Sequence, residues 1–143
     1  MTSHPVSEEL KRCFVGSTCL SVEWLENIWK FEFERSTVCV ESCWRIVTSN
    51  AIAIASGDDK QYFGHPQPVD AAAQALKLLS KPVVTLGVDV LTADLQIEFE
   101  ENVRLEVWNG SSGYEPWNCS TKSGLQIYAL GGGKLSIYRD LAS

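Results

Sequence analysis

The chain contains an internal repeat. Residues 20–34 (LSVEWLENIWKFEFE) align without a gap on residues 86–100 (LGVDVLTADLQIEFE), and six of the fifteen positions are identical. Chance would give about one identity in a stretch of this length. The identical pairs are Leu20/Leu86, Val22/Val88, Leu25/Leu91, Glu32/Glu98, Phe33/Phe99 and Glu34/Glu100. Because both copies carry the same apolar pattern, the repeat favours a fold in which two related halves share one core.

The repeat extends in both directions when small gaps are allowed. The further matches are Pro5–Ser7 over Pro68–Asp70, Val38–Glu41 over Val103–Glu106, Trp44 over Trp117, and Ile52–Ile54 over Leu125–Ile127. The second of these matches requires one extra residue in the first turn. A chain of 143 residues is also the length of one domain. We therefore predict a single domain over residues 1–143, with halves at approximately 4–64 and 65–139 related by an approximate two-fold.

Each half begins with a pattern typical of a short helix. In the second half Asp70 is a good N-cap, and Pro82 ends the helix. Between them the apolar residues recur at helical spacing, at Ala72, Ala75, Leu76 and Leu79. In the first half Ser7 is expected to cap a shorter and more polar turn over residues 8–12, which we expect to dock less deeply.

The remainder of each half alternates between apolar and polar residues. Trp29, Phe31 and Phe33 alternate with charged residues, and Leu95, Ile97 and Phe99 do the same. Such alternation is typical of antiparallel strands with one buried face. A tight hairpin is expected at Glu101-Asn102, with further strands over residues 44–47, 52–55, 125–128 and, after three glycines, 135–138. The predicted class is α+β, internally duplicated, each half a short helix followed by an antiparallel β-meander.

Charge and hydropathy exclude several classes of function. The formal net charge is −6, and Lys11-Arg12 is the one local cluster of basic residues, so a nucleic-acid partner is not expected. An acidic surface suits solubility, or a basic partner protein through long-range attraction. No apolar run approaches the roughly 20 residues of a membrane helix. The first residues do not resemble a secretory signal, so we expect a cytoplasmic protein with reduced thiols.

The cysteines and histidines give no metal pattern. The five cysteines contain no C-x-x-C pair, and the two histidines lie far from them in the sequence. Tetrahedral zinc sites usually show close pairs of ligands, so no metal and no cofactor are expected. Motifs for a nucleophile elbow, a phosphate loop or a dinucleotide site are also absent from the sequence.

Two loops differ between the halves and are the first candidates for function. Residues 56–66 contain Asp58, Asp59 and His65, which could bind a hard cation or supply a general base, or could form a solvated turn. Residues 109–116 and the following tryptophan offer an aromatic–acid–aromatic group. Its members are Tyr114, Glu115 and Trp117, which could form a binding hot spot or pack on the end of the sheet.

The repeated Glu-x-Glu pairs suggest a third candidate site. If the two-fold brings the strands together, Glu32, Glu34, Glu98 and Glu100 could line one acidic groove and raise each other's pKa. The alternative is two separate faces of the sheet, both exposed to solvent.

Three strings in the sequence resemble a known set of proteins. They are VES-x-WRI at residues 40–46, DL-x-I-x-F at 94–99 and YE-x-W at 114–117, followed by a late glycine-rich turn. They are similar to small bacterial proteins of unknown function, some of which are regarded as immunity partners of secreted toxins. The resemblance implies a binding protein and brings no catalytic residues.

Two functions remain open at this stage. The first is a non-enzymatic protein-binding module, immunity-like, that covers a basic partner. The second is a small-molecule binder or hydrolase with an acidic cleft between the halves. A homo-oligomer formed through an exposed sheet edge is a further possibility.

Overall fold

The computed structural model describes residues 2–140, which form two helices and eleven strands. The first half contains α1 (Val6–Phe14), β1 (Cys19–Leu25), β2 (Ile28–Phe33), β3 (Ser36–Val40), β4 (Trp44–Val47) and β5 (Ile52–Ala55). The second half contains α2 (Ala71–Leu79), β6 (Val83–Val88), β7 (Leu95–Phe99), β8 (Val103–Val107), β9 (Trp117–Thr121), β10 (Leu125–Ala129) and β11 (Leu135–Arg139). No helix in this described part is long and apolar enough to cross a membrane.

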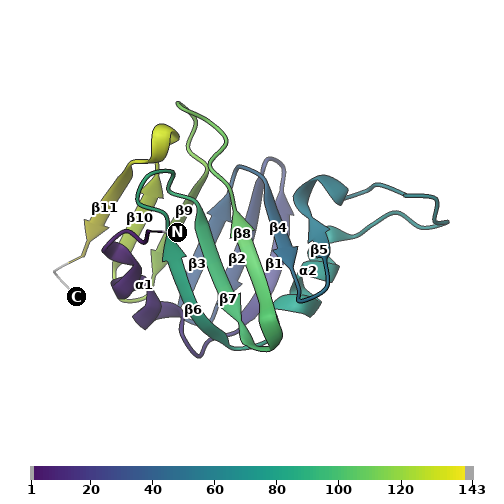
Figure 1. Ribbon diagram of the computed structural model, residues 1–143, viewed down its shortest axis with the longest axis horizontal. Helices are drawn as coiled ribbons and strands as arrows, with labels where there is room; N and C mark the ends of the chain where they lie inside the picture. Colours follow the sequence, from purple (N-terminus) through teal and green to yellow (C-terminus); the bar gives the residue numbers. More distant parts are fainter. Residues whose placement is uncertain (1, 141–143) are drawn as a thin grey trace.

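The strands form two antiparallel sheets that pack face to face (Figure 1). One sheet has the order β1-β2-β3-β9-β10-β11, and the other has the order β5-β4-β8-β7-β6. The predicted α+β class with antiparallel sheets is therefore confirmed. Each half does begin with a helix and an antiparallel meander, β1-β2-β3 and β6-β7-β8, but its later strands leave that meander, because β4 pairs with β8 and β9 pairs with β3. Each sheet therefore contains strands of both halves, and neither half can form its sheet alone.

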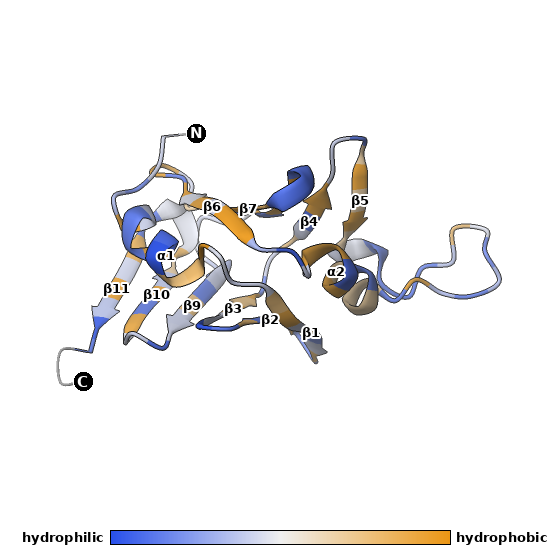
Figure 2. Cartoon of the chain, turned by 90° about the horizontal axis from the view of Figure 1, so that it is seen from below, coloured by the Kyte–Doolittle hydropathy of each residue, from blue (hydrophilic) through white to orange (hydrophobic). Residues whose placement is uncertain are grey.

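The core lies between the two sheets. Phe31 and Phe33 are buried on β2, and Ile97 and Phe99 are buried on β7, as the alternation predicted. The rings of Phe33 and Phe99 stack across the two sheets with their centroids 6.2 Å apart. Figure 2 shows the two layers from below, with α1 and α2 near opposite ends of the sandwich. There α1 packs against β6, and α2 packs against β1 and β5.

The two helices confirm one predicted cap and correct the other. The Asp70 carboxylate accepts a hydrogen bond from the Ala73 N–H at 3.1 Å, so it caps α2 as expected. Ser7 is not a cap, because α1 already begins at Val6. The Ser7 side chain instead is buried and accepts a hydrogen bond from the Val88 N–H at 3.0 Å. This helix also docks deeply, contrary to expectation, burying Val6, Leu10 and Phe14.

The strand register corrects the alignment of the first strands. Val22 lies opposite Phe31, and Leu86 lies opposite Ile97, so Val22 corresponds to Leu86 in the structure. The ungapped alignment instead places Leu20 over Leu86, which is two residues out of step. A shift of two keeps every side chain on the same face, so hydrophobic alternation cannot detect it.

The register also moves the extra turn residue from the first half to the second. Val38 lies opposite Phe31, and Leu105 lies opposite Ile97, so Val38 corresponds to Leu105 and not to Val103. The turn over Glu100–Asn102 provides the additional residue, and Glu101 there has φ 63°. The match of the two tryptophans survives: Trp44 lies opposite Val107, and Trp117 lies opposite Val40.

The segment between β5 and α2 forms an arm that projects from the sandwich (Figures 1 and 2). Lys60 donates its N–H to the Val69 carbonyl at 2.8 Å, and Val69 donates its N–H to the Gln61 carbonyl at 2.7 Å. Residues 61–68 are all exposed, including Tyr62 and Phe63. The arm is therefore held by backbone hydrogen bonds at its base, and its aromatic side chains lie outside the core.

Candidate functional site

The residues predicted in the loop 56–66 do not form a common site. The Asp58 carboxylate accepts a hydrogen bond from the Ala55 N–H at 2.9 Å, and that of Asp59 accepts one from the Ala71 N–H at 3.0 Å. His65 is exposed on the arm. The two aspartates thus hold a turn and the start of α2, which is the alternative role that the sequence offered. Within residues 2–140, no group of three His, Cys, Asp or Glu side chains is placed to hold a metal ion.

The four glutamates do not form an acidic groove. Glu32 on β2 and Glu98 on β7 alternate with Phe33 and Phe99, which point inward and stack between the sheets. The two glutamates therefore lie on opposite outer faces of the sandwich. A hydrolase or ligand site using these carboxylates would need them in one cleft, and the structure keeps them apart.

The other two glutamates also have separate surroundings. The Glu34 carboxylate accepts hydrogen bonds from the Thr18 N–H at 3.2 Å and from the Thr18 hydroxyl at 3.1 Å. Glu100 is exposed in the turn between β7 and β8. Glu34 and Glu100 therefore lie at the turns of two different hairpins, one in each sheet.

The predicted aromatic–acid–aromatic group separates into a core residue and a surface pair. Trp117 is fully buried, and its indole N–H donates to the Ala93 carbonyl at 2.8 Å. Tyr114 is 84% exposed, and Glu115 is half-buried beside it. The Ser111 hydroxyl accepts a hydrogen bond from the Tyr114 N–H at 2.9 Å, which fixes the loop that presents the tyrosine. Only Tyr114 and Glu115 are thus available to a partner.

Asn109 joins three loops at this end of the sandwich. Its N–H donates to the Asp94 carboxylate at 2.7 Å, and its side-chain amide donates to the carbonyls of Thr92 and Leu130 at 2.9 and 3.2 Å. A Cβ at Gly133 would collide with the carbonyl of the β6–β7 loop, so glycine is required there by close approach. The glycine run was predicted only as a hairpin turn, and it also lets the loops pack together.

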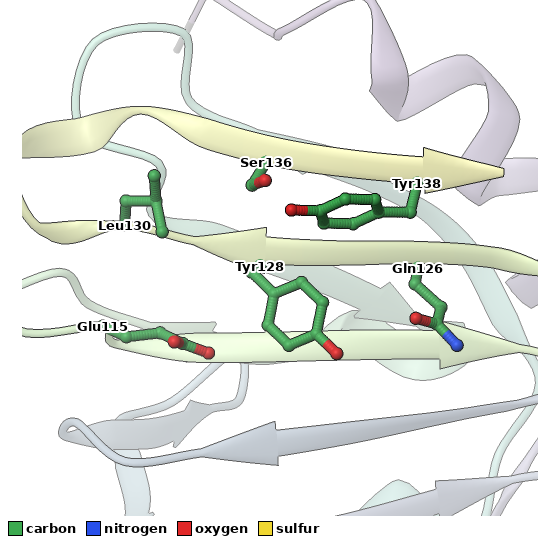
Figure 3. A pocket seen from close by; sticks show the side chains of 6 residues that line it. All are labelled: Glu115, Gln126, Tyr128, Leu130, Ser136 and Tyr138. Carbon is green, nitrogen blue, oxygen red and sulfur yellow. The ribbon is translucent and has the colours of Figure 1, made fainter.

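A shallow hollow of about 410 Å³ lies on the outer face of β10 and β11 beside the start of β9 (Figure 3). We call it the tyrosine hollow; it is lined by Glu115, Gln126, Tyr128, Leu130, Ser136 and Tyr138. The rings of Tyr128 and Tyr138 meet edge to face with centroids 6.0 Å apart. In Figure 3 the side chains of Glu115, Tyr128 and Gln126 all lie over β9. The hollow thus combines two aromatic rings, a carboxylate and uncharged polar groups.

The tyrosine hollow was only partly predicted from sequence. Glu115 was a candidate, whereas Tyr128 and Tyr138 were counted only as the ends of predicted strands. The alternation of the strands could have found them, because Gln126 and Tyr128 alternate with the buried Leu125 and Ile127 and must face outward. Proximity of β10 to β11 across the glycine turn would then have brought the two tyrosines together.

The charged side chains on the outer face of the other sheet bind to one another. The Glu106 carboxylate accepts hydrogen bonds from Arg45 and Arg104, both at 2.7 Å. The Arg45 guanidinium also lies 4.3 Å from the centre of the Trp108 ring. Burial raises the pKa of Glu106, but the two arginines outweigh it and hold the pKa below its usual value. These charged side chains therefore already have partners on their own sheet.

Burial makes three of the five thiols poor nucleophiles. Burial raises the pKa of Cys19 to about 12 and raises the pKa of Cys119 further still. The pKa of Cys39 is also raised by burial, and Cys43 is exposed. A thiol with a raised pKa stays protonated near neutral pH and is a poor nucleophile.

Comparisons with family models, with curated proteins and with solved structures found no match to this chain. The resemblance to immunity-like bacterial proteins therefore stays a prediction. Function must be argued from the surface itself, and the tyrosine hollow is the site with the clearest chemistry.

Proposed function

We propose that this protein is a non-enzymatic protein-binding module that holds a basic partner, as an immunity-like protein would, on the tyrosine hollow. The observation that carries the proposal is the exposure of Tyr138, at 57%, in a hollow that Tyr128 and the Glu115 carboxylate also line. Tyrosine gives a large contact area at a low cost in side-chain entropy and is enriched in binding hot spots.

The chemistry of the hollow favours a cationic group of the partner. A lysine or arginine side chain lying over a tyrosine ring gains a cation–π interaction, and Glu115 adds an opposite charge beside Tyr128. The net charge of −6 would draw a basic protein toward the surface from a distance. Gln126 and Ser136 offer further hydrogen-bonding groups without the cost of burying a charge.

We also propose that the two halves arose by duplication and are related by an approximate two-fold. Three features support this: the parallel order of elements, the bulge that follows the Cys19 and Val83 pairs, and the matched tryptophans. The hollow would then belong to the second copy alone, because β11 has no counterpart after β5 in the first half. A binding site on β11, which has no counterpart in the first half, agrees with the expectation that positions shared by the two halves maintain the fold.

The test is capture of the partner by matched tyrosine variants. Immobilised wild-type protein, Tyr138→Ala and Tyr62→Ala are incubated with extract of the host cells, and bound proteins are quantified by mass spectrometry. Tyr62 on the arm is 55% exposed, against 57% for Tyr138, so the two variants remove equally exposed rings from different places.

We expect one basic protein to be retained by wild type and Tyr62→Ala and reduced about tenfold or more by Tyr138→Ala. The proposal fails if no protein depends on Tyr138, or if the dependent protein is acidic.

A further inference from the structure

The outer edge of β6 is covered by the chain itself. The Val88 N–H donates to the Ser7 hydroxyl at 3.0 Å, and the Val88 carbonyl accepts from the His4 N–H at 2.7 Å. Ser3 pairs antiparallel with Asp89, so residues 2–4 act as a short added strand. Val88 itself is fully buried.

The corresponding edge of β1 has α2 packed against it but lacks this backbone pairing. Trp24 lies opposite Trp29 as Val88 lies opposite Leu95, so Trp24 holds the same place in its sheet. Leu25 pairs with Ile28 beside the turn of the hairpin. In an antiparallel ladder the adjacent residue, Trp24, then directs its N–H and C=O away from the neighbouring strand. Among the described residues, none forms a backbone hydrogen bond to Trp24 on that side.

Two sequence differences explain the open edge. The second residue of α1 is Ser7, whose hydroxyl bonds to β6, whereas the second residue of α2 is Ala72, which has no hydroxyl. The segment before α1 runs along β6, whereas the segment before α2 turns away. There Val69 pairs with Lys60 and Gln61 at the base of the arm.

The open edge is also apolar. Leu20 is 57% exposed, Leu25 is 47% exposed, and Trp24 is 42% exposed. An edge strand with free backbone groups and exposed apolar side chains is a template for another strand. Residues 2–4 on β6 show the geometry that such a strand would adopt.

We propose that the outer edge of β1 docks an extended strand of a basic partner protein, antiparallel to β1, by β-augmentation. Backbone groups of that strand bond to the N–H and C=O of Trp24, its apolar side chains pack on Trp24, and the basic side chains that alternate with them lie on the face of Glu23. The basic character of the partner rests on the proposed function, whereas the edge itself is a separate surface from the tyrosine hollow.

Local charge selects the partner strand over a second copy of this chain. The hairpin over residues 19–34 contains four glutamates (Glu23, Glu26, Glu32 and Glu34) and one lysine. Pairing β1 with β1 of a second copy would bring two such acidic hairpins together, which is unfavourable. A strand that alternates apolar with basic residues satisfies both the apolar edge and the charge.

The test uses a fluorescent hexapeptide that alternates valine and lysine, and a matched peptide of valine and glutamate. Binding is measured by fluorescence anisotropy with wild type, Trp24→Ala and Trp24→Pro. Both variants lose the indole, whose ring centroid lies 5.0 Å from that of Trp29, but only proline also removes the N–H. Proline is tolerated at an edge where the N–H faces solvent, so both variants are expected to fold.

We expect wild type to bind the lysine peptide and not the glutamate peptide, and Trp24→Pro to bind about tenfold more weakly than Trp24→Ala. Equal binding by the two variants, or equal binding of the two peptides, would overturn the proposal. So would light scattering that shows a dimer dissociated by Trp24→Pro, because the edge would then serve a second copy.

Two further measurements separate this surface from the hollow. Tyr138→Ala should leave peptide binding unchanged; if that variant alone loses the peptide, the hollow binds it and the edge proposal is wrong while the proposed function stands. In wild type, amide hydrogen exchange at Trp24 should slow when the lysine peptide is added. Unchanged exchange contradicts the proposal without relying on any variant.

Discussion

The two matched tryptophans make a sensitive test of the core. Trp44 and Trp117 are both buried at the starts of corresponding strands, but only the Trp117 indole donates a hydrogen bond, to the Ala93 carbonyl. The Trp44 indole N–H has no partner among the described residues. Trp117→Phe therefore removes a hydrogen bond, whereas Trp44→Phe removes a buried N–H that has no acceptor among the described residues.

The expected difference follows from these partners. Because the same atoms are removed from a buried indole at both sites, we expect the cavity cost, at about 24 cal/mol per Å³, to largely cancel in the comparison. Trp117→Phe loses a hydrogen bond worth about 1 kcal/mol, and Trp44→Phe removes a buried unpaired donor that costs at least about 1 kcal/mol. We predict that Trp117→Phe is about 2 kcal/mol less stable than Trp44→Phe.

Urea unfolding followed by far-UV circular dichroism measures this difference without relying on tryptophan fluorescence. At this chain length about 2 kcal/mol corresponds to a melting temperature roughly 8 °C lower for Trp117→Phe. Equal stabilities, or a lower stability of Trp44→Phe, would refute the assignment of the two indole environments.

Three other predictions follow from buried groups. Ser7→Ala should destabilise by about 1–3 kcal/mol in urea unfolding, because the Val88 N–H loses its partner, whereas Ser36→Ala should cost little because the buried Ser36 hydroxyl has none among the described residues. Glu106→Gln should be less stable than wild type at pH 7, and this difference in stability should disappear in unfolding curves recorded in acid. Folding lowers the pKa of the Glu106 carboxylate, so the carboxylate stabilises the protein above its usual pKa and loses that contribution as the pH falls through the lowered value. Iodoacetamide at pH 8 should label the exposed Cys43 and spare Cys119 until the protein is unfolded, as mass spectrometry can show, because burial raises the pKa of Cys119. A Ser36→Ala loss as large as that of Ser7→Ala, a pH-independent gap for Glu106→Gln, or early labelling of Cys119 would each contradict the structure.

Local elements could be predicted from sequence because their signals are local. The alternation around Phe31 and Ile97 identified strands and their buried faces, and the carboxylate of Asp70 identified the start of α2. The crossing of β4 and β9 into the opposite sheets could not be predicted in this way. A period of two says which face is buried, but not which strand lies alongside.

The alignment of the halves failed for the same reason. Leu20 and Val22 both precede polar residues in an alternating strand, so a shift of two residues preserved the pattern and gained identities. Only the pairing with β2 fixes the register. Ser7 was likewise assigned from its type as a cap, whereas its partner, Val88, lies far away in the sequence.

The candidate site shows a similar limit. Asp58 and Trp117 were candidates for a binding site because of their side-chain types, but both form hydrogen bonds with the backbone of the chain itself. The tyrosine hollow is assembled from ordinary strand residues that become neighbours only when β10 pairs with β11. There Tyr128 lies opposite Ser136, and Tyr138 lies two residue pairs further along, opposite Gln126.

The central claim is that the tyrosine hollow binds a basic protein. Once the protein retained through Tyr138 is purified, stopped-flow measurement of its association with wild type and with Glu115→Gln, across a range of salt concentrations, tests this most directly. We predict an association rate that falls as salt rises and a complex that dissociates faster when Glu115 is neutralised. An association rate independent of salt, together with unchanged dissociation from Glu115→Gln, would contradict it.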